Sequence, residues 1–405
     1  MHVLMISDVY FPRINGVSTS IETFRTGLAK QGVRTTLLAP EYPAGTTENE
    51  EGIVRIPSRY LPMDPEDRMM KRGALRAWLA DQHERFDLVH IQTPFVAHYA
   101  GLEMARTLGV PTLASYHTYF EEYLHHYVPW VPGSWMRNLA RRFSRTQCDA
   151  LDAVVVPSRA MADTLTQYGV RRPLHVLPTG LDDSRFSGGD GEFFRTRYRI
   201  EPDRPLLLFV GRVAHEKNIG FLIDVVERLR ARQPKVLLLV TGEGPALDSL
   251  REAVVDRHLD HHVRFLGYLE RRHELADCYR AADVFVFASR TETQGLVLLE
   301  AMALGTPVVA LAAMGTRDIL EGTPGTIAAP HDIAGFTDAV HGVLADPAHR
   351  EWMRRAARHS ALQWRAEEMA ARMAALYETL CEQHAQGKQR IKMPGMTDRE
   401  TATGF

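Results

Sequence analysis

The sequence predicts an α/β protein with two domains, each built on a doubly wound parallel sheet, and three observations lead to this expectation. The chain has 405 residues, more than a single hydrophobic core usually serves. Short, continuous apolar runs alternate with segments of helical period, which is typical of parallel strands covered on both faces by helices. Between two sets of such runs lies the glycine-rich stretch "DSRFSGGDGEFF", which is typical of a linker. A cleft between two facing domains is therefore expected.

The apolar runs give the expected strands and the domain boundaries. In the first half they are "HVLMIS", "RTTLLAP", "FDLVHIQ", "TLASYH" and "DAVVVPS", and in the second "PLLLFVG", "VLLLVTG", "VRFLGY", "DVFVFAS" and "PVVAL". A long helical pattern rich in alanine, arginine and glutamate follows them. We expect an N-terminal domain over residues 1–180, a linker over 181–203 and a C-terminal domain over 204–360. A helix over 361–384 is expected to cross back to the N-terminal domain, followed by a loose tail over 385–405.

The composition excludes several classes of protein. With 45% hydrophobic residues, 24% charged residues and a formal net charge of -2, the chain is not expected to be disordered, fibrous or generally attracted to nucleic acid. Its cysteines, Cys148, Cys278 and Cys381, lie far apart and form no C-x-x-C pair, which fits a reducing compartment. The N-terminus lacks the basic segment of a signal peptide, and no apolar run approaches the roughly 18 residues that cross a bilayer. We expect a cytoplasmic protein, and attachment to a membrane surface stays open.

The segment "FVGRVAHEKNIGF" carries the first chemical signal. A buried strand ends at Gly211, Arg212 and Lys217 follow, and a helix begins after them. Open α/β sheets bind ligands where a strand's carboxyl end meets a helix N-terminus, and two cations there favour an anion such as a diphosphate. A solvated turn is the alternative for this segment taken alone. No D-x-D triplet occurs in the chain, so we expect no metal, and protein cations would neutralise the diphosphate.

The segment "SRTETQGLVLLEAMALG" places Glu292 and Glu300 eight residues apart around a helix start. If the helix begins after Gln294, with Gly295 loosening the backbone, both carboxylates can face the cleft. A carboxylate beside a bound anion is best used to accept hydrogen bonds from hydroxyl groups, from a sugar at Glu292 and from a ribose at Glu300. The alternative is a charge at a helix start and an ordinary surface residue.

Two further positions in the N-terminal half follow strands. Gly16, in "PRINGVSTS", comes after the first strand and before an amphipathic helix, where its backbone N–H groups could approach a phosphate. His117 ends the strand in "LASYHTYF", a place where α/β folds display functional groups. A plain turn at Gly16 and a structural histidine at His117 are the alternatives when each is taken alone.

Taken together, these motifs resemble the retaining glycosyltransferases of family 4, whose GT-B fold has two Rossmann-like domains. The resemblance rests on "FVGRVAHEKN", on "SRTETQGLVLLEAMALGTPVVA" with its E-x7-E pair, and on "NGVS", "YHT" and "VPS…TGLD". It covers residues 1 to about 380. One departure stands out, because Gln294 occupies a position where many relatives have an aromatic residue.

The resemblance implies roles for individual residues. Arg212 and Lys217 would bind the donor diphosphate, Gly16 would close over the phosphates, and Glu300 would contact the ribose. The transferred sugar would be held by Glu292 and by the backbone of the next four residues, Thr293, Gln294, Gly295 and Leu296. His117 would lie beside the sugar and the acceptor, so the catalytic set is His117, Glu292, Arg212 and Lys217. Transfer would proceed on one face of the sugar without metal, with the leaving phosphate helping to deprotonate the acceptor.

Within the family, "TETQGL" and "YHTYFEEYLHHY" look most like the diacylglycerol glucosyltransferase branch. This similarity implies a UDP-glucose donor and a membrane lipid acceptor such as diacylglycerol. A GDP-mannose donor, a soluble acceptor, and a non-catalytic nucleotide-sugar-binding module remain as alternatives.

The helix expected at "SWMRNLARRFSR", residues 134–145, has a composition typical of a membrane interface. At about 100° per residue, an apolar face opposes a basic face. The apolar face includes Trp135, Leu139 and Phe143, and the basic face consists of Arg137, Arg141, Arg142 and Arg145. An anionic membrane surface is therefore an expected partner, with the protein peripheral on the inner face of the cell membrane. The alternative is a surface helix that packs its apolar face inward.

Overall fold

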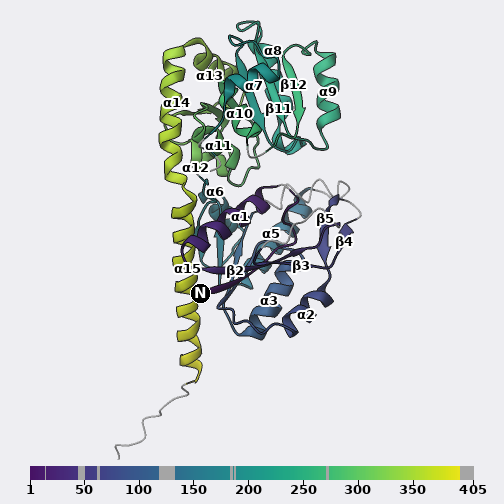
Figure 1. Ribbon diagram of the computed structural model, residues 1–405, viewed down its shortest axis with the longest axis vertical. Helices are drawn as coiled ribbons and strands as arrows, with labels where there is room; N and C mark the ends of the chain where they lie inside the picture. Colours follow the sequence, from purple (N-terminus) through teal and green to yellow (C-terminus); the bar gives the residue numbers. More distant parts are fainter. Residues whose placement is uncertain are drawn as a thin grey trace, which may run out of the picture.

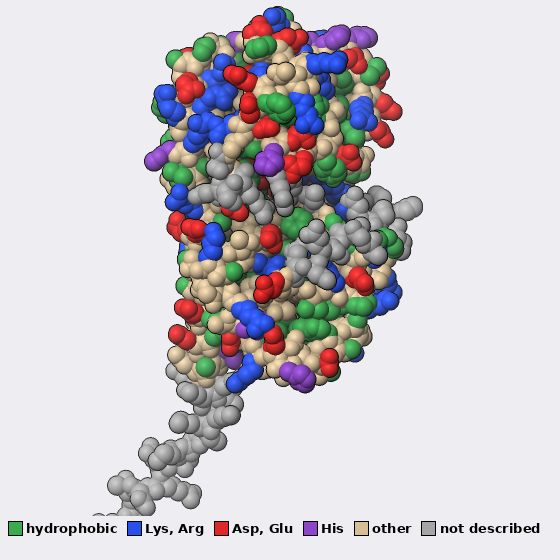
Figure 2. Space-filling view, viewed as in Figure 1, with side chains coloured by type: hydrophobic (Ala, Val, Ile, Leu, Met, Phe, Trp, Pro, Cys, Tyr) green, Lys and Arg blue, Asp and Glu red, His purple; other side chains and the backbone are tan. Residues whose placement is uncertain are grey.

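The computed structural model contains two parallel sheets, one in each of two stacked domains, which confirms the predicted fold class (Figure 1). It describes residues 1–13, 15–43, 51–61, 64–117, 133–182, 186, 188–270 and 273–392. Positive and negative side chains are interspersed on the face shown in Figure 2, as the small net charge suggests. Among the described residues, no helix is long and apolar enough to span a membrane.

The N-terminal domain has a seven-stranded parallel sheet in the order β3-β2-β1-β6-β7-β8-β9 and an antiparallel ribbon, β4-β5. The strands are β1 His2–Ile6, β2 Arg34–Pro40, β3 Ile53–Ile56, β4 Ser58–Leu61, β5 Asp64–Met70, β6 Leu88–Ile91, β7 Thr112–Ser115, β8 Ala153–Val156 and β9 Leu174–Val176. Its helices include α1 Gly16–Lys30, α2 Arg72–Ala80, α3 Val96–Leu108, α5 Gly133–Asp149 and α6 Arg159–Gln167.

The C-terminal domain has a six-stranded parallel sheet in the order β12-β11-β10-β13-β14-β15. The strands are β10 Leu206–Val210, β11 Leu237–Thr241, β12 Val263–Gly267, β13 Val284–Phe287, β14 Val308–Leu311 and β15 Thr326–Ala329. The helices are α7 Gly191–Arg197, η2 His215–Lys217, α8 Ile219–Leu229, α9 Leu247–Asp256, α10 Glu274–Ala281, α11 Leu296–Ala303, α12 Gly315–Leu320, α13 Ile333–Ala345, α14 Pro347–Ala361, η3 Leu362–Trp364 and α15 Ala366–Lys392.

All the strands expected from apolar runs are present, and the strands that the sequence pattern missed lie mostly at sheet edges. Central strands such as β8 and β10 are buried along their whole length. The missed edge strands β3, β9 and β15 are mostly only half-buried. An edge strand has a neighbour on one side only and keeps polar residues, so its apolar run is too weak to recognise.

The strand orders define where each domain is expected to bind a ligand. The chain reverses its direction across the sheet between β1 and β6 in the N-terminal domain, and between β10 and β13 in the C-terminal domain. Open α/β sheets bind ligands outside the carboxyl ends of the strands at this switch point. The loops that follow these four strands are therefore the first candidates for a functional site.

The segment predicted as a linker packs in the core of the C-terminal domain, and the last helix packs in the core of the N-terminal domain. Within residues 181–203, helix α7 forms, and Phe194 and Ile200 are buried in the core of the C-terminal domain. Helices α14 and α15 run in line along one side of both domains (Figure 1). Met373 and Tyr377 of α15 are buried in the N-terminal core. Helix α15 continues to Lys392, beyond the residue at which a loose tail was expected to begin.

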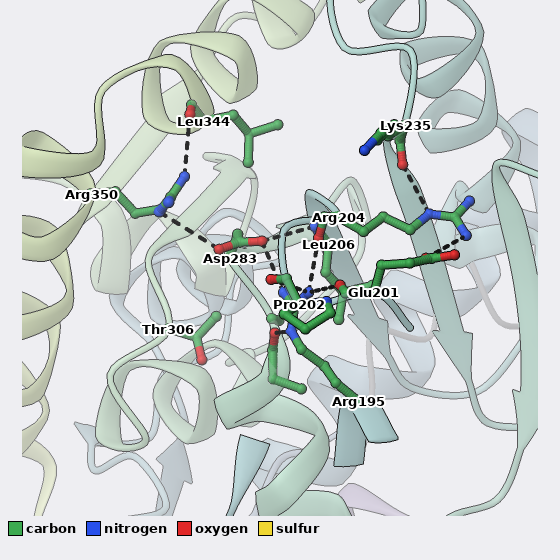
Figure 3. Close-up of polar contacts among 12 residues, drawn as sticks. Arg195, Glu201, Pro202, Arg204, Leu206, Lys235, Asp283, Thr306, Leu344 and Arg350 are labelled. Atoms are coloured by element: carbon green, nitrogen blue, oxygen red, sulfur yellow. Dashed lines mark hydrogen bonds and ion pairs between the residues drawn. The ribbon is translucent and has the colours of Figure 1, made fainter. Parts of the chain in front are cut away.

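A buried network fixes the start of β13, the strand that leads into the candidate site (Figure 3). Asp283 accepts hydrogen bonds at Oδ2 from the Leu206 amide at 2.9 Å and from Arg195 Nη2 at 3.1 Å. Its other oxygen lies 3.6 Å from both Arg350 Nε and Arg354 Nη2 of α14. One carboxylate thus joins α7, β10, β13 and α14.

Candidate active site

The loop after β10 is held by backbone contacts with the loop after β11. The Val213 amide donates to the Glu243 carbonyl at 2.9 Å, and the Ala246 amide donates to the Val213 carbonyl at 3.0 Å. A Cβ atom at Gly242 would lie 2.0 Å from the Gly211 carbonyl oxygen, so only glycine fits there. The stretch "TGEGPA", residues 241–246, therefore shapes the loop that carries Arg212. The Arg212 side chain is exposed.

The loops after β10 and β13, the two strands at the switch point, are tied to each other. Asn218 donates from Nδ2 to the Ala288 carbonyl at 3.2 Å, and Ser289 donates from Oγ to the Glu216 carbonyl at 3.1 Å. Asn218 has a left-handed backbone, with φ of 56°, just before α8. An asparagine before an amphipathic helix is a recognisable start signal, but its bond to the neighbouring loop is not evident from the sequence.

Lys217 and Glu292, which are 75 residues apart, form an ion pair at this junction. Lys217 Nζ lies 2.6 Å from Glu292 Oε2, and the two side chains are 20% and 21% exposed. The sequence assigned the lysine to a diphosphate and the glutamate to a sugar. Because the two groups are in contact, an anion bound at the ammonium and a hydroxyl bound at the carboxylate would also be close neighbours.

The turn before α11 is shaped by two glycines. Gly295 has φ of 96° and precedes the helix, whose first turn begins with the Leu298 amide donating to the Gly295 carbonyl at 2.9 Å. A Cβ atom at Gly315 would lie 2.0 Å from the Thr293 carbonyl oxygen, so α12 packs directly against this turn. The start of α11, at the partly buried Leu296 and Val297, carries backbone N–H groups without partners in the helix and the positive end of the helix dipole.

Gln294 contributes to this turn differently from its neighbours. Its side chain is only 6% exposed, and both polar atoms are bonded to the backbone of Thr179. The side chain of Gln294 is therefore bonded within the protein, and only its backbone is free to take the sugar-binding role that the resemblance implies.

Glu300 lies inside α11 and is 6% exposed. Tyr279 of α10 donates from its hydroxyl to Glu300 Oε2 at 2.8 Å. The alternative of an ordinary surface residue is therefore wrong for Glu300. This hydrogen bond holds the carboxylate in one orientation.

Gly16 begins α1 directly after the switch-point strand β1 and its loop. The side chain of Asn15 accepts from the Ser18 amide at 2.8 Å and caps the helix, whose first turn contains no acidic residue. Among the residues that the structure describes, a Cβ atom at Gly16 would meet nothing within 4 Å, and its φ is not positive. Neither their packing nor the backbone conformation requires glycine here, so the phosphate-binding role that the resemblance implies stays a prediction.

His117 connects the two domains and is neutral near pH 7. Its carbonyl accepts from Thr293 Oγ1 at 3.1 Å, so the carboxyl ends of both sheets meet here. Its Nε2 lies 3.2 Å from Oε1 of Gln92, a residue after β6 that the sequence pattern did not indicate. Burial lowers the pKa of His117 to about 4. The imidazole can therefore exchange hydrogen bonds but carries no charge near pH 7.

We expect the unfolding temperature to fall as the pH is lowered from about 6.5 to about 4. Burial lowers the pKa of His90 to about 3 and of His98 to about 4, from 6.5, as it does for His117. Below pH 6.5 the unfolded chain then binds protons that the folded chain does not, which destabilises the fold. Burial raises the pKa of Asp8 to about 6, so Asp8 opposes this trend, but it is one group against three.

The test compares melting temperatures from pH 8 to pH 4 for the wild type and for His90→Gln, which keeps a donor and an acceptor but does not titrate. The variant should lose less stability over this range. Equal losses in the two proteins would contradict the assignment to His90.

Helix α5 was expected either to lie at a membrane surface or to pack its apolar face inward, and its described residues match neither expectation completely. Ala140 is buried and Phe143 packs on the core, but Leu139 is 59% exposed. The inward face also contains polar residues, because Ser144 is bonded to the Tyr116 hydroxyl and Gln147 donates to the Pro94 carbonyl. Arg141, Arg142 and Arg145 line an open groove of about 750 Å³. The side chains of Trp135 and Arg137 lie outside the described residues.

Two observations complete the description of the site. No group of three or more histidine, cysteine, aspartate or glutamate side chains that could hold a metal ion occurs among the residues that the structure describes. Two Rossmann-like sheets, whose carboxyl-terminal loops meet at the hydrogen bond between Thr293 and His117 beside the Lys217–Glu292 pair, define a glycosyltransferase of the GT-B class.

Comparison with known proteins identifies the family. Residues 14–185 match the family described as "Glycosyltransferase Family 4", and residues 190–360 match "Glycosyl transferases group 1". The chain belongs to the family 4 glycosyltransferases, as the sequence motifs predicted.

The names of similar proteins show which activities occur among relatives of this chain. The chain is 32% identical to an alpha-monoglucosyldiacylglycerol synthase of Streptococcus pneumoniae, over 76% of this chain and 71% of the relative. It is 31% identical to a GDP-mannose-dependent alpha-mannosyltransferase of Mycobacterium tuberculosis, over 79% and 81%. Among solved structures, Anabaena HepE in complex with UDP and glucose is similar in fold, with a TM-score of 0.76 and 16% identity over 94% of this chain and all of the other.

Proposed function

We propose that the protein transfers glucose from UDP-glucose to a membrane lipid acceptor such as diacylglycerol, with retention at the anomeric carbon. The observation that carries this proposal is the contact between Lys217 and Glu292, which puts a phosphate-binding cation beside a hydroxyl-binding carboxylate at the switch point. The similarity to a glucosyldiacylglycerol synthase supports glucose and the lipid. The structural neighbour solved with UDP and glucose supports the nucleotide.

In the proposed reaction, the acceptor hydroxyl attacks C1 of the glucose on the face from which UDP leaves. The bond from C1 to the β-phosphate oxygen breaks, and the hydroxyl proton passes to the leaving phosphate. Arg212 and Lys217 stabilise the negative charge that develops on the diphosphate, together with the helix N-terminus at Gly16. Glu292 accepts hydrogen bonds from the sugar, and Glu300 accepts them from the ribose.

His117 is proposed to lie beside the sugar and the acceptor, on the N-terminal side of the site. It is neutral near pH 7, since burial lowers its pKa to about 4. It would therefore orient hydroxyl groups by hydrogen bonding and would not act as a cation. Charge stabilisation would come from Arg212 and Lys217 of the C-terminal domain and from the helix N-terminus at Gly16, and no metal would be required.

A groove with aromatic and basic side chains in the N-terminal domain supports a lipid acceptor. The groove has a volume of about 690 Å³, and Phe95, three residues after Gln92 in the sequence, belongs to its lining. Phe95 and Tyr99 are 53% and 49% exposed, an unusual position for two neighbouring aromatic residues unless they meet an apolar partner. Among the residues that the structure describes, its lining carries three cations and consists of Arg59, Met69, Met70, Lys71, Arg72, Phe95, Val96 and Tyr99. An acyl chain beneath an anionic membrane surface fits this lining.

The alternatives differ in donor and acceptor. The similarity to a GDP-mannose-dependent alpha-mannosyltransferase favours GDP-mannose as the alternative donor. A soluble acceptor would make the groove at Phe95 irrelevant to turnover.

The test measures release of UDP or GDP from UDP-glucose, UDP-galactose and GDP-mannose by the purified full-length chain. Each donor is offered with vesicles of phosphatidylglycerol and phosphatidylcholine, with and without diacylglycerol. We expect release of UDP from UDP-glucose that requires diacylglycerol, with a glucolipid as the product. Preference for GDP-mannose, or equal turnover without lipid, would contradict the proposal.

A further inference from the structure

The chain crosses between its two domains twice, and the crossings lie side by side. Leu177 is buried in the N-terminal core and Leu181 in the C-terminal core, so the first crossing consists of residues 178–180. The second follows Trp364, which packs on the C-terminal core. The Leu181 amide donates to the Trp364 carbonyl at 2.7 Å, and the Ala366 amide donates to the Leu181 carbonyl at 2.9 Å. We call these paired crossings the hinge.

The side chain of Gln294 is bonded to the middle of this hinge. Gln294 Oε1 accepts from the Thr179 amide at 2.9 Å, and Gln294 Nε2 donates to the Thr179 carbonyl at 2.7 Å. The Thr179 hydroxyl lies 2.7 Å from Ser20 Oγ on α1, the helix that begins at Gly16. All three side chains are buried. The hinge is thus connected on one side to α1 and on the other to the turn that carries Glu292.

We propose that Gln294 is a positioning residue that couples the donor-binding turn to the hinge. The proposal rests on the proposed function, since it assigns the sugar of the donor to this turn. Two buried hydrogen bonds to one residue fix both the distance and the orientation of the turn relative to residues 178–180. The turn cannot shift against the hinge without leaving the Thr179 amide and carbonyl unsatisfied inside the protein.

The coupling is specific to the amide side chain. An aromatic side chain at this position could not both accept from and donate to one peptide unit. In this chain the relative position of the domains therefore acts directly on the turn that holds Glu292. Misplacing that turn by about 1 Å is sufficient to lower turnover by up to about a hundredfold.

The test uses Gln294→Met, which has a similar length but makes neither bond, and Ser20→Ala as the matched control. Ser20→Ala removes the hydrogen bond between α1 and the Thr179 hydroxyl and leaves both bonds from Gln294 in place. Amide hydrogen exchange at Thr179 is measured in the protein without donor, and KM for the donor and kcat are measured with saturating acceptor. Melting temperatures show that each variant is folded.

In Gln294→Met we expect exchange at Thr179 to accelerate by at least about tenfold, and KM for the donor to rise by about tenfold or more. In Ser20→Ala both quantities should stay within about twofold of the wild type. If Gln294→Met fails to fold, Gln294→Glu replaces it. A carboxylate oxygen in place of Nε2 cannot donate to the Thr179 carbonyl and is repelled by it, so the same changes are expected.

Unchanged exchange and an unchanged donor KM in the Gln294 variant would overturn the proposal, as would equal changes in the Ser20→Ala control. Failure of the proposed function would appear separately, as a wild type that releases no nucleotide from any donor. The exchange measurement does not depend on the donor, so it tests the coupling in either case.

Discussion

Replacing Lys217 by alanine is expected to lower kcat/KM for the donor by about a hundredfold to a thousandfold, and Arg212→Ala should have an effect of similar size. A preorganised group that stabilises charge developing in the transition state contributes about this much when it is removed singly. No metal is proposed to share the task, so the two cations carry it. The measurement is the steady-state rate of nucleotide release, with melting temperatures as the check on folding.

Lys217 also pairs with Glu292, so the loss of the ion pair must be separated from the loss of the cation. Lys217→Arg keeps the charge, and it should retain more activity than Lys217→Ala. The pair is about one-fifth exposed, and its loss should change stability only modestly. Full turnover in either Lys217→Ala or Arg212→Ala would argue strongly against the assigned diphosphate site.

Replacing Asp283 by alanine is expected to destabilise the C-terminal domain by about 3 kcal/mol, the lower end for breaking a buried ion pair. Asp283 is 15% exposed and is the shared acceptor for the Leu206 amide and for the arginines of α7 and α14. Its removal leaves several partly buried donors and an excess of positive charge without a partner, which costs more than the loss of a single ion pair. Urea unfolding followed by circular dichroism measures the change.

Asp338→Ala is the matched control, because Asp338 forms a single ion pair with Arg232 at 2.7 Å in which both side chains are about half exposed. An exposed pair of this kind contributes at most about 1 kcal/mol. Asp283→Ala should therefore lower the urea midpoint far more than the control. Similar midpoints for the two variants would show that the network around Asp283 is not a main source of stability.

The parts of the site that the sequence indicated are those that depend on local signals. Arg212 and Lys217 follow an unbroken apolar run, and a glycine marks the end of that strand. Glu292 lies just before the glycine that starts α11, and Gly16 lies just before an amphipathic helix. Each position follows from the rule that a parallel strand, a turn and a helix succeed one another along the chain.

By itself, then, the sequence determined the two-sheet architecture, the family and the strand ends at which the functional residues lie. Only the tertiary structure decided that Lys217 faces Glu292, that Gln294 is bonded to Thr179 and not to a ligand, and that Leu139 is exposed while Ala140 is buried. Apolar periodicity reports how much of a residue is buried, because burial repeats with the period of the helix or strand. It does not report the partner, since partners 75 or 115 residues away are set by how sheets, helices and domains pack together.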